Sequence, residues 1–261
     1  MVSRTFCVML AAGLSSVCLV AQTGSSVADA TQPVPPVKSG ASNPESLTPE
    51  RRGDILMARK MYREAVETYK PEARENPVIW NKIGIAYHQM QQLDTAMKYY
   101  EKAVKLNPKY AEALNNLGTV YYARKSYRKA GSYYNKALKI TPDSASVYSN
   151  LGTSLFARKK YKEASEAYQT ALKLDPEVFE HRSSYGTLLQ ERSVEERAKF
   201  HYYLAKTYAK AGRNDLALQY MRKALEEGFK ERKKFEEDPE FEALRETPEF
   251  KELMTLEPRV L

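Results

Sequence analysis

Three blocks of 34 residues follow one another: PVIWNKIGIAYHQMQQLDTAMKYYEKAVKLNPKY (77–110), AEALNNLGTVYYARKSYRKAGSYYNKALKITPDS (111–144) and ASVYSNLGTSLFARKKYKEASEAYQTALKLDPEV (145–178). Six columns of the blocks keep one kind of residue. They are the seventh (Ile83, Leu117, Leu151), eighth (Gly84, Gly118, Gly152), twentieth (Ala96, Ala130, Ala164), twenty-fourth (Tyr100, Tyr134, Tyr168), twenty-seventh (Ala103, Ala137, Ala171) and thirty-second (Pro108, Pro142, Pro176). Such a period predicts an array of stacked supersecondary units.

Each block predicts two short helices that cross closely. The glycine of the eighth column lies in the first helix, where it costs about 1 kcal/mol relative to alanine, so close packing must require it. The alanine of the twentieth column gives the second helix a matching small surface. Large residues in the fourth, seventh, eleventh and twenty-fourth columns are expected to fill the space between hairpins. The proline ends each unit, because it cannot continue a helix.

The columns resemble the tetratricopeptide-repeat family, whose pattern is W-x2-L-G-x2-Y, then A-x3-F, then P. The first block has Trp80, Ile83, Gly84 and Tyr87 in those places, and the second block matches in the same way. The resemblance implies an all-α fold, an α-solenoid in which antiparallel helix pairs form a right-handed superhelix. The array is similar to those of exported bacterial members of the family.

Weaker units flank the three clear ones. Residues 49–76 predict a degenerate first unit, because Gly53, Ala65 and Tyr69 keep the spacing. Residues 179–228 predict an irregular region with a first helix at 179–190. A capping box at Ser193–Glu196 opens a further helix, and a last helix ends at Gly228. The pairing of these helices stays open at this point.

The C-terminal residues 229–261 predict short helices that cover the end of the array. Asp238-Pro239-Glu240-Phe241 and Thr247-Pro248-Glu249-Phe250 each combine an N-cap residue, a proline, an acid and an apolar anchor. Terminal repeats need a lid of this kind with a polar outer face.

Residues 1–30 predict a signal peptide. A positive start (Arg4) precedes a 16-residue apolar run at 6–21, which is short for a membrane span, and small residues follow. Cleavage is expected after Ala21, Ala28 or Ala30, and residues 31–48 read as a disordered Pro/Ser-rich linker. The expected location is therefore periplasmic or secreted. A membrane anchor, or a lipid anchor at Cys18, is the less favoured alternative.

The composition points away from catalysis. Both cysteines, Cys7 and Cys18, would leave with the signal peptide, which removes disulfides and thiolate sites from the mature chain. The histidines His88, His181 and His201 have no metal-ligand or triad context, and no phosphate-binding glycine loop is present. We therefore expect no enzyme activity, no metal and no cofactor. The net charge of +8 permits an acidic partner, although solubility alone explains it equally well.

The resemblance implies a peptide-binding groove along the first helices. Carried over from the family, the groove residues occupy four columns. They are the fifth column (Asn81, Asn115, Ser149), the sixth (Lys82, Asn116, Asn150), the ninth (Ile85, Thr119, Thr153) and the twelfth (His88, Tyr122, Phe156). This set predicts a polar groove with an aromatic stripe along one side, and its amides suit a peptide backbone. The alternative is that asparagine in the sixth column only follows the family consensus. The carboxylate clamp of chaperone-binding relatives does not match, because one place in five agrees.

A second predicted surface is a basic edge in the turns between paired helices. It comprises Arg124, Lys125, Arg158, Lys159, Lys160 and Lys210. The main hypothesis is a non-enzymatic adaptor in the bacterial envelope that binds a protein or peptide in the groove. The alternative is an accessory subunit of a secretion or enzyme complex, docked through the basic edge to an acidic protein or anionic surface. Nucleic acid is not expected, because it fits poorly with secretion.

Overall fold

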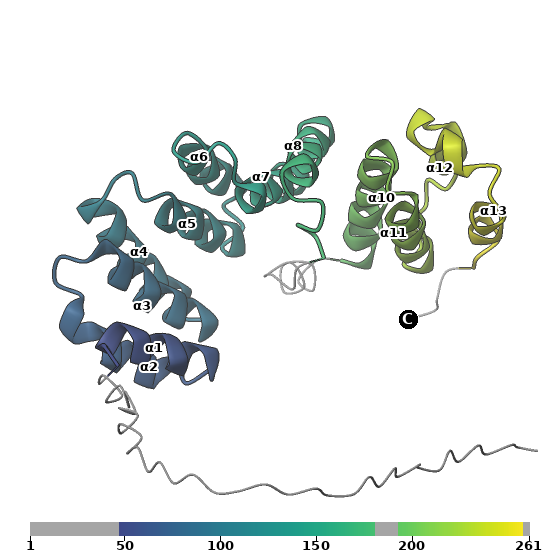
Figure 1. Cartoon of the computed structure of the whole chain (residues 1–261). Helices are drawn as coiled ribbons and strands as arrows, with labels where there is room; N and C mark the ends of the chain where they lie inside the picture. Colours follow the sequence, from purple (N-terminus) through teal and green to yellow (C-terminus); the bar gives the residue numbers. More distant parts are fainter. Residues whose placement is uncertain (1–46, 181–192, 258–261) are drawn as a thin grey trace, which may run out of the picture. The chain divides into compact units, whose positions relative to one another are not determined.

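A computed structural model describes residues 47–180 and 193–257, which all belong to one compact unit. The expected signal peptide, nearly all of the linker, His181 and most of the helix expected at 179–190 lie outside these residues. Every regular element in the described ranges is a helix (Figure 1), so the all-α prediction is confirmed. None of the helices described is both long and apolar enough to cross a membrane.

The helices form consecutive pairs that pack as antiparallel hairpins (Figure 1). The pairs are α1 (Pro49–Ala58) with α2 (Tyr62–Tyr69), α3 (Pro77–Gln89) with α4 (Leu93–Leu106), α5 (Ala111–Ala123) with α6 (Tyr127–Leu138), α7 (Ala145–Ala157) with α8 (Tyr161–Leu174), and α10 (Val194–Lys210) with α11 (Asn214–Glu226). The second helix of each of the first three pairs also packs on the first helix of the next pair. The described chain is therefore an α-solenoid.

The turns inside the hairpins share one geometry. In the first four pairs a residue with left-handed backbone follows the first helix; these residues are Lys60, Gln91, Lys125 and Lys159, with φ between 58° and 61°. In the turn after α5, the amides of Lys125 and Ser126 donate to the carbonyls of Tyr122 and Tyr121, at 2.8 Å each. These bonds satisfy carbonyls at the end of the helix and reverse the chain. In the α10–α11 pair Gly212 takes the left-handed place, with φ 73°.

The glycine of the eighth column is the contact point of each clear hairpin. A Cβ added to Gly118 would lie 2.4 Å from a ring carbon of Tyr134, and one added to Gly84 would lie 2.5 Å from Tyr100. The tyrosine rings are almost completely buried. The twenty-fourth-column tyrosine therefore packs on the glycine of its own hairpin in addition to filling space between hairpins, where Tyr100 shares a buried cluster with Leu117 and Val120 of α5.

A second set of aromatic contacts explains the high tyrosine content. In three hairpins the eleventh-column tyrosine stacks on the twenty-third-column tyrosine. The pairs are Tyr87–Tyr99, Tyr121–Tyr133 and Tyr208–Tyr220, with ring centroids 5.2, 5.2 and 5.3 Å apart. These rings hold the two helices of one hairpin together, and offset-stacked rings contribute about 0.5–1.5 kcal/mol beyond their buried area.

The irregular region contains a fifth hairpin. The Ser193 hydroxyl accepts a hydrogen bond from the Glu196 amide at 3.2 Å, which caps α10 as the sequence predicts. Helices α10 and α11 pack on each other, and α10 also contacts α8. The pairing that the sequence left open is therefore α10 with α11.

The C-terminal segment folds as α12 (Lys233–Glu237), a 3₁₀ helix η2 (Pro239–Leu244) and α13 (Pro248–Met254). Helix η2 packs on α10 and α13 packs on α11, with Phe241 and Phe250 buried. Asp238 accepts hydrogen bonds from Tyr202 and Lys206. The two predicted short helices are present, and the first of them is wound as a 3₁₀ helix.

The glycine contact predicts the effect of one methyl group. We expect Gly118→Ala to lower the free energy of unfolding by about 1–3 kcal/mol, because the new Cβ displaces the buried Tyr134 ring. Urea unfolding monitored by circular dichroism measures the change. The matched control is Gly131→Ala on α6, whose Cβ would lie 3.1 Å from the Ser154 hydroxyl and in ordinary contact with Leu151 and Arg158, at 3.8 and 3.9 Å. An equal loss in both variants would contradict the assigned role of the eighth column.

Candidate protein-binding surface

The twelve predicted groove residues all lie on the first helices α3, α5 and α7, and none of them is fully exposed. Five are buried: Asn81, Tyr122, Ser149, Thr153 and Phe156. The other seven are half-buried: Lys82, Ile85, His88, Asn115, Asn116, Thr119 and Asn150. The surface that these helices offer to a ligand is therefore narrower than the column pattern suggests.

The expected aromatic stripe needs correction. Tyr122 is 6% exposed and its ring lies against Tyr127, with centroids 5.1 Å apart. Phe156 is 4% exposed and packs edge-on against Phe200 of α10, at 5.4 Å. Both rings are buried by the next helices along the chain, so they contribute to the core and not to an open surface.

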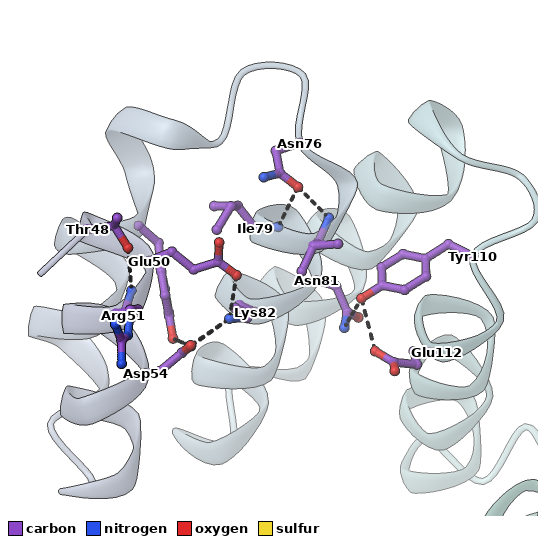
Figure 2. Close-up of polar contacts among 12 residues, drawn as sticks. Thr48, Glu50, Arg51, Asp54, Asn76, Ile79, Asn81, Lys82, Tyr110 and Glu112 are labelled. Atoms are coloured by element: carbon purple, nitrogen blue, oxygen red, sulfur yellow. Dashed lines mark hydrogen bonds and ion pairs between the residues drawn. The ribbon is translucent and has the colours of Figure 1, made fainter.

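The asparagines of the fifth and sixth columns join successive repeats. The Asn116 side-chain amide donates to Asn81 Oδ1 at 2.9 Å, and the Asn150 amide donates to Asn115 Oδ1 at 3.0 Å. Asn81 in turn donates to the Tyr110 hydroxyl at 3.4 Å, and that hydroxyl donates to Glu112 at 3.0 Å (Figure 2). A fifth-column residue thus binds the sixth-column residue of the following repeat.

Between the first two repeats, the contact from the fifth to the sixth column is an ion pair. Lys82, in the sixth column, donates to Glu50 at 2.7 Å and to Asp54 at 2.8 Å, as Figure 2 shows. Asp54 also accepts from the Tyr69 hydroxyl at 2.7 Å. Burial alone would raise the pKa of Asp54, but the hydrogen bonds from Lys82 and Tyr69 outweigh it and hold the pKa below its usual value. Lys82 therefore has a structural role in joining the first two repeats.

Sequence reasoning did not identify Glu50 and Asp54 as partners of Lys82. The signal was present, because Glu50 lies three residues before Gly53, as Asn81 lies three residues before Gly84. It places Glu50 in the fifth column of the degenerate unit, opposite the sixth-column lysine.

The paired asparagines keep part of their hydrogen-bonding capacity. A side-chain amide offers two N–H donors and an acceptor oxygen. In the part of the chain that the structure describes, Asn116 and Asn150 use only their amide nitrogens as donors, and Asn115 uses only its Oδ1. The remaining carbonyl oxygens and N–H groups form a half-buried row across α5 and α7 that suits the alternating donors and acceptors of an extended peptide.

The histidines offer no metal centre in the described residues, where no group of three metal-ligating side chains occurs. His88 is half-buried, with its Nδ1 3.5 Å from the Tyr100 hydroxyl, and burial lowers its pKa. Its imidazole is therefore mainly neutral at physiological pH and can exchange hydrogen bonds. His201 of α10 is buried, and its Nδ1 lies 2.7 Å from a carboxylate oxygen of Glu227.

The predicted basic edge is partly neutralised. Arg124 pairs with Asp94 at 3.1 Å, and Lys160 pairs with Glu163 at 2.7 Å. Lys125 and Lys159 are exposed in their turns, as is Lys210 at the end of α10, whereas Arg158 is half-buried. The edge therefore presents isolated lysines and not a continuous ridge of unpaired charge.

Comparison with known proteins agrees with the observed repeats. Models of the tetratricopeptide repeat match residues 75–143, 109–177 and 149–230. Among solved structures, MamA from Desulfovibrio magneticus RS-1 is 21% identical with a TM-score of 0.48, over 68% of this chain and 92% of that one. The first repeat domain of Spaghetti (RPAP3), bound to an HSP90 peptide, is 25% identical with a TM-score of 0.39, over 44% and 91%. A comparison with curated protein sequences finds no match.

The asparagine pairs predict measurable coupling between repeats. We expect Asn81→Ala and Asn116→Ala each to lower the free energy of unfolding by about 1–2 kcal/mol, because each leaves a partly buried amide without its partner. The double variant should be less destabilised than the sum of the two, by about 1 kcal/mol, in a urea-unfolding cycle. Strictly additive losses would mean that the 2.9 Å contact contributes nothing to stability.

Proposed function

The chain belongs to the tetratricopeptide-repeat family, and we propose that it is a non-enzymatic scaffold that binds an extended peptide segment of another protein. Repeats of this family stack into extended surfaces that bind proteins. The family models cover residues 75–230, more than half of the chain. The finer proposal, that the peptide lies across α5 and α7, is carried by one observation: the half-buried row of asparagine amides.

The position of the row supports this assignment. The Asn115–Asn150 pair aligns its two amides at a 3.0 Å contact, which restricts their rotation. Groups that are already oriented lose less conformational entropy when a ligand binds. Thr119, whose hydroxyl donates to the backbone carbonyl of Asn115 at 3.2 Å, lies one turn further along α5. A peptide backbone supplies both a donor and an acceptor at each residue, so it satisfies the free halves of the amides.

A peptide-selection experiment tests the binding surface. Random peptides are selected on the full-length protein, and their affinities are compared with a variant that carries Asn115→Ala and Asn150→Ala. Removing both members of the pair leaves neither amide unsatisfied, so the fold should be retained. We expect affinity to fall at least about tenfold, because two ligand hydrogen bonds of about 1 kcal/mol each are lost.

The matched control carries Lys125→Ala and Lys159→Ala in the turns, and we expect its affinity for the same peptides to be unchanged. Loss of affinity in this control alone would move the binding site to the basic edge. Failure to select any peptide would contradict the proposed function as a whole.

We further propose that the protein acts outside the cytoplasm of a bacterial cell, in the periplasm or beyond. The support is the positive start followed by the uncharged apolar run at 6–21, with small residues after it. N-terminal sequencing of the protein recovered from separated cell fractions tests this proposal. We expect a mature chain that begins at Gln22, Asp29 or Thr31. An intact Met1 recovered from the cytoplasm would refute it.

A further inference from the structure

A basic pocket of about 440 Å³ lies between α6 and α7, apart from the asparagine row. Its lining includes Gly131 and the half-buried Leu151 and Leu155, together with the polar Ser132 and Asn135. Its rim carries four cationic side chains: Arg128, Lys136, Lys139 and Arg158. In the ranges that the structure describes, no ion pair joins a carboxylate to any of the four. Arg158 acts only at longer range on Glu163, which is paired with Lys160.

The equivalent position between α4 and α5 is filled by the chain itself. There the fourteenth-column Arg124 pairs with the eighteenth-column Asp94 at 3.1 Å. The guanidinium of Arg124 also lies 3.7 Å from the sulfur of Met97, in the twenty-first column. A largely exposed carboxylate and a half-buried thioether of the chain itself therefore contact this arginine at the surface of the interface.

The same three columns differ between α6 and α7. The fourteenth column keeps an arginine, Arg158, but the eighteenth changes from Asp94 to Arg128 and the twenty-first from Met97 to Gly131. A Cβ built on Gly131 would lie 3.9 Å from a terminal nitrogen of Arg158, which places the guanidinium beside the gap. One interface thus carries its own acid and apolar side chain, whereas the next lacks both.

We propose that the α6–α7 pocket binds an acidic side chain of a protein partner together with the aliphatic side chain next to it. The carboxylate takes the place that Asp94 occupies in the preceding interface, where it receives hydrogen bonds from Arg158 and Arg128. The aliphatic group takes the place of Met97, over Leu151 and Leu155. Arginine suits this role because its planar fork binds carboxylates with two parallel hydrogen bonds.

The remaining lysines strengthen the preference for a negatively charged partner. Lys136 lies over the ring of Tyr133, with Nζ 4.8 Å from the centroid, which fixes its position at the rim. Lys139, the C-cap residue of α6, is exposed. Four cations around one pocket attract an acidic segment over several ångströms, and this attraction weakens as salt rises.

A defined peptide pair tests the proposal on the full-length protein. The probe is a fluorescent eight-residue peptide that contains two Leu-Glu steps, and its counterpart has Gln in place of both Glu residues. We expect anisotropy titrations to show binding of the Glu peptide that weakens at high salt, and at least tenfold weaker binding of the Gln peptide. A Kd above about 1 mM for the Glu peptide would overturn the proposal.

Three variants locate the site. Arg128→Gln with Arg158→Gln removes both guanidiniums, and Gly131→Met keeps every charge but fills the gap as Met97 does. Arg128→Asp rebuilds the internal pair seen between Asp94 and Arg124. Each should reduce binding of the Glu peptide at least tenfold while the melting temperature shows that the fold is kept. Unchanged binding in Gly131→Met and in Arg128→Asp would overturn the assignment.

Matched controls separate the pocket from charge in general. Arg124→Gln with Lys162→Gln changes the same two columns in neighbouring interfaces, and Asn115→Ala with Asn150→Ala removes the asparagine row. Both should bind the Glu peptide as the unmodified protein does. An equal loss in the first control would mean that net charge alone attracts the peptide. Because the asparagine variant is tested separately, failure of this pocket and failure of the peptide-binding row are distinguishable.

The same titration also tests whether another anion, or a second copy of the chain, occupies the pocket. Inorganic phosphate and phosphatidylglycerol vesicles are added as competitors, and displacement of the Glu peptide by either at millimolar concentration would overturn a carboxylate-specific pocket. Residues 236–257 contain nine acidic and two basic residues. Concentration-dependent self-association in sedimentation, lost in Gly131→Met, would identify this segment of a second copy as the occupant and overturn the proposed foreign partner.

Discussion

The contact between the eighth-column glycine and the twenty-fourth-column tyrosine sets the distance between the two helices of a hairpin. The ring of Tyr134 lies where a side chain of Gly118 would begin, and Gly53, Gly84 and Gly152 repeat the arrangement. Because the ring occupies the glycine surface completely, the helices cannot approach more closely or slide without moving a buried aromatic. The alanines of the twentieth and twenty-seventh columns, which are fully or almost fully buried, complete the same crossing.

Successive hairpins are joined by polar contacts in constant columns. Glu50–Lys82, Asn81–Asn116 and Asn115–Asn150 each connect a fifth-column residue with the sixth-column residue of the next repeat. The cap continues this scheme, because the Tyr202 hydroxyl bonds to Asp238 just before η2. Tyr202 occupies the fifth column if Met221 is placed in the twenty-fourth. The cap thus behaves as one further layer with a polar outer side.

The columns that repeat along the chain were predictable from the sequence, because close helix crossing restricts them to glycine, alanine and tyrosine. The exposure of the groove residues was not, because it depends on the neighbouring layer. Phe156 and Tyr122 are on the first helices, as the columns predict, but the next helices bury them. The sequence identified the asparagine columns. It did not predict that they pair across repeats, because that depends on how far one repeat is offset from the next. The α6–α7 pocket was not predicted, because it results from the loss of an acid and an apolar side chain that the preceding interface has.

The packing columns tolerate little change, so differences between repeats collect in columns outside the glycine–tyrosine crossing. Asp94 and Arg128 occupy the same place on α4 and α6, yet one neutralises an arginine and the other adds to its charge. Met97 and Gly131 likewise fill or leave open the same space. Neither exchange alters the hairpin crossing, because neither side chain lies between the paired helices' glycine and tyrosine. A repeat array can therefore acquire a distinct site at one interface while its remaining layers keep a common fold.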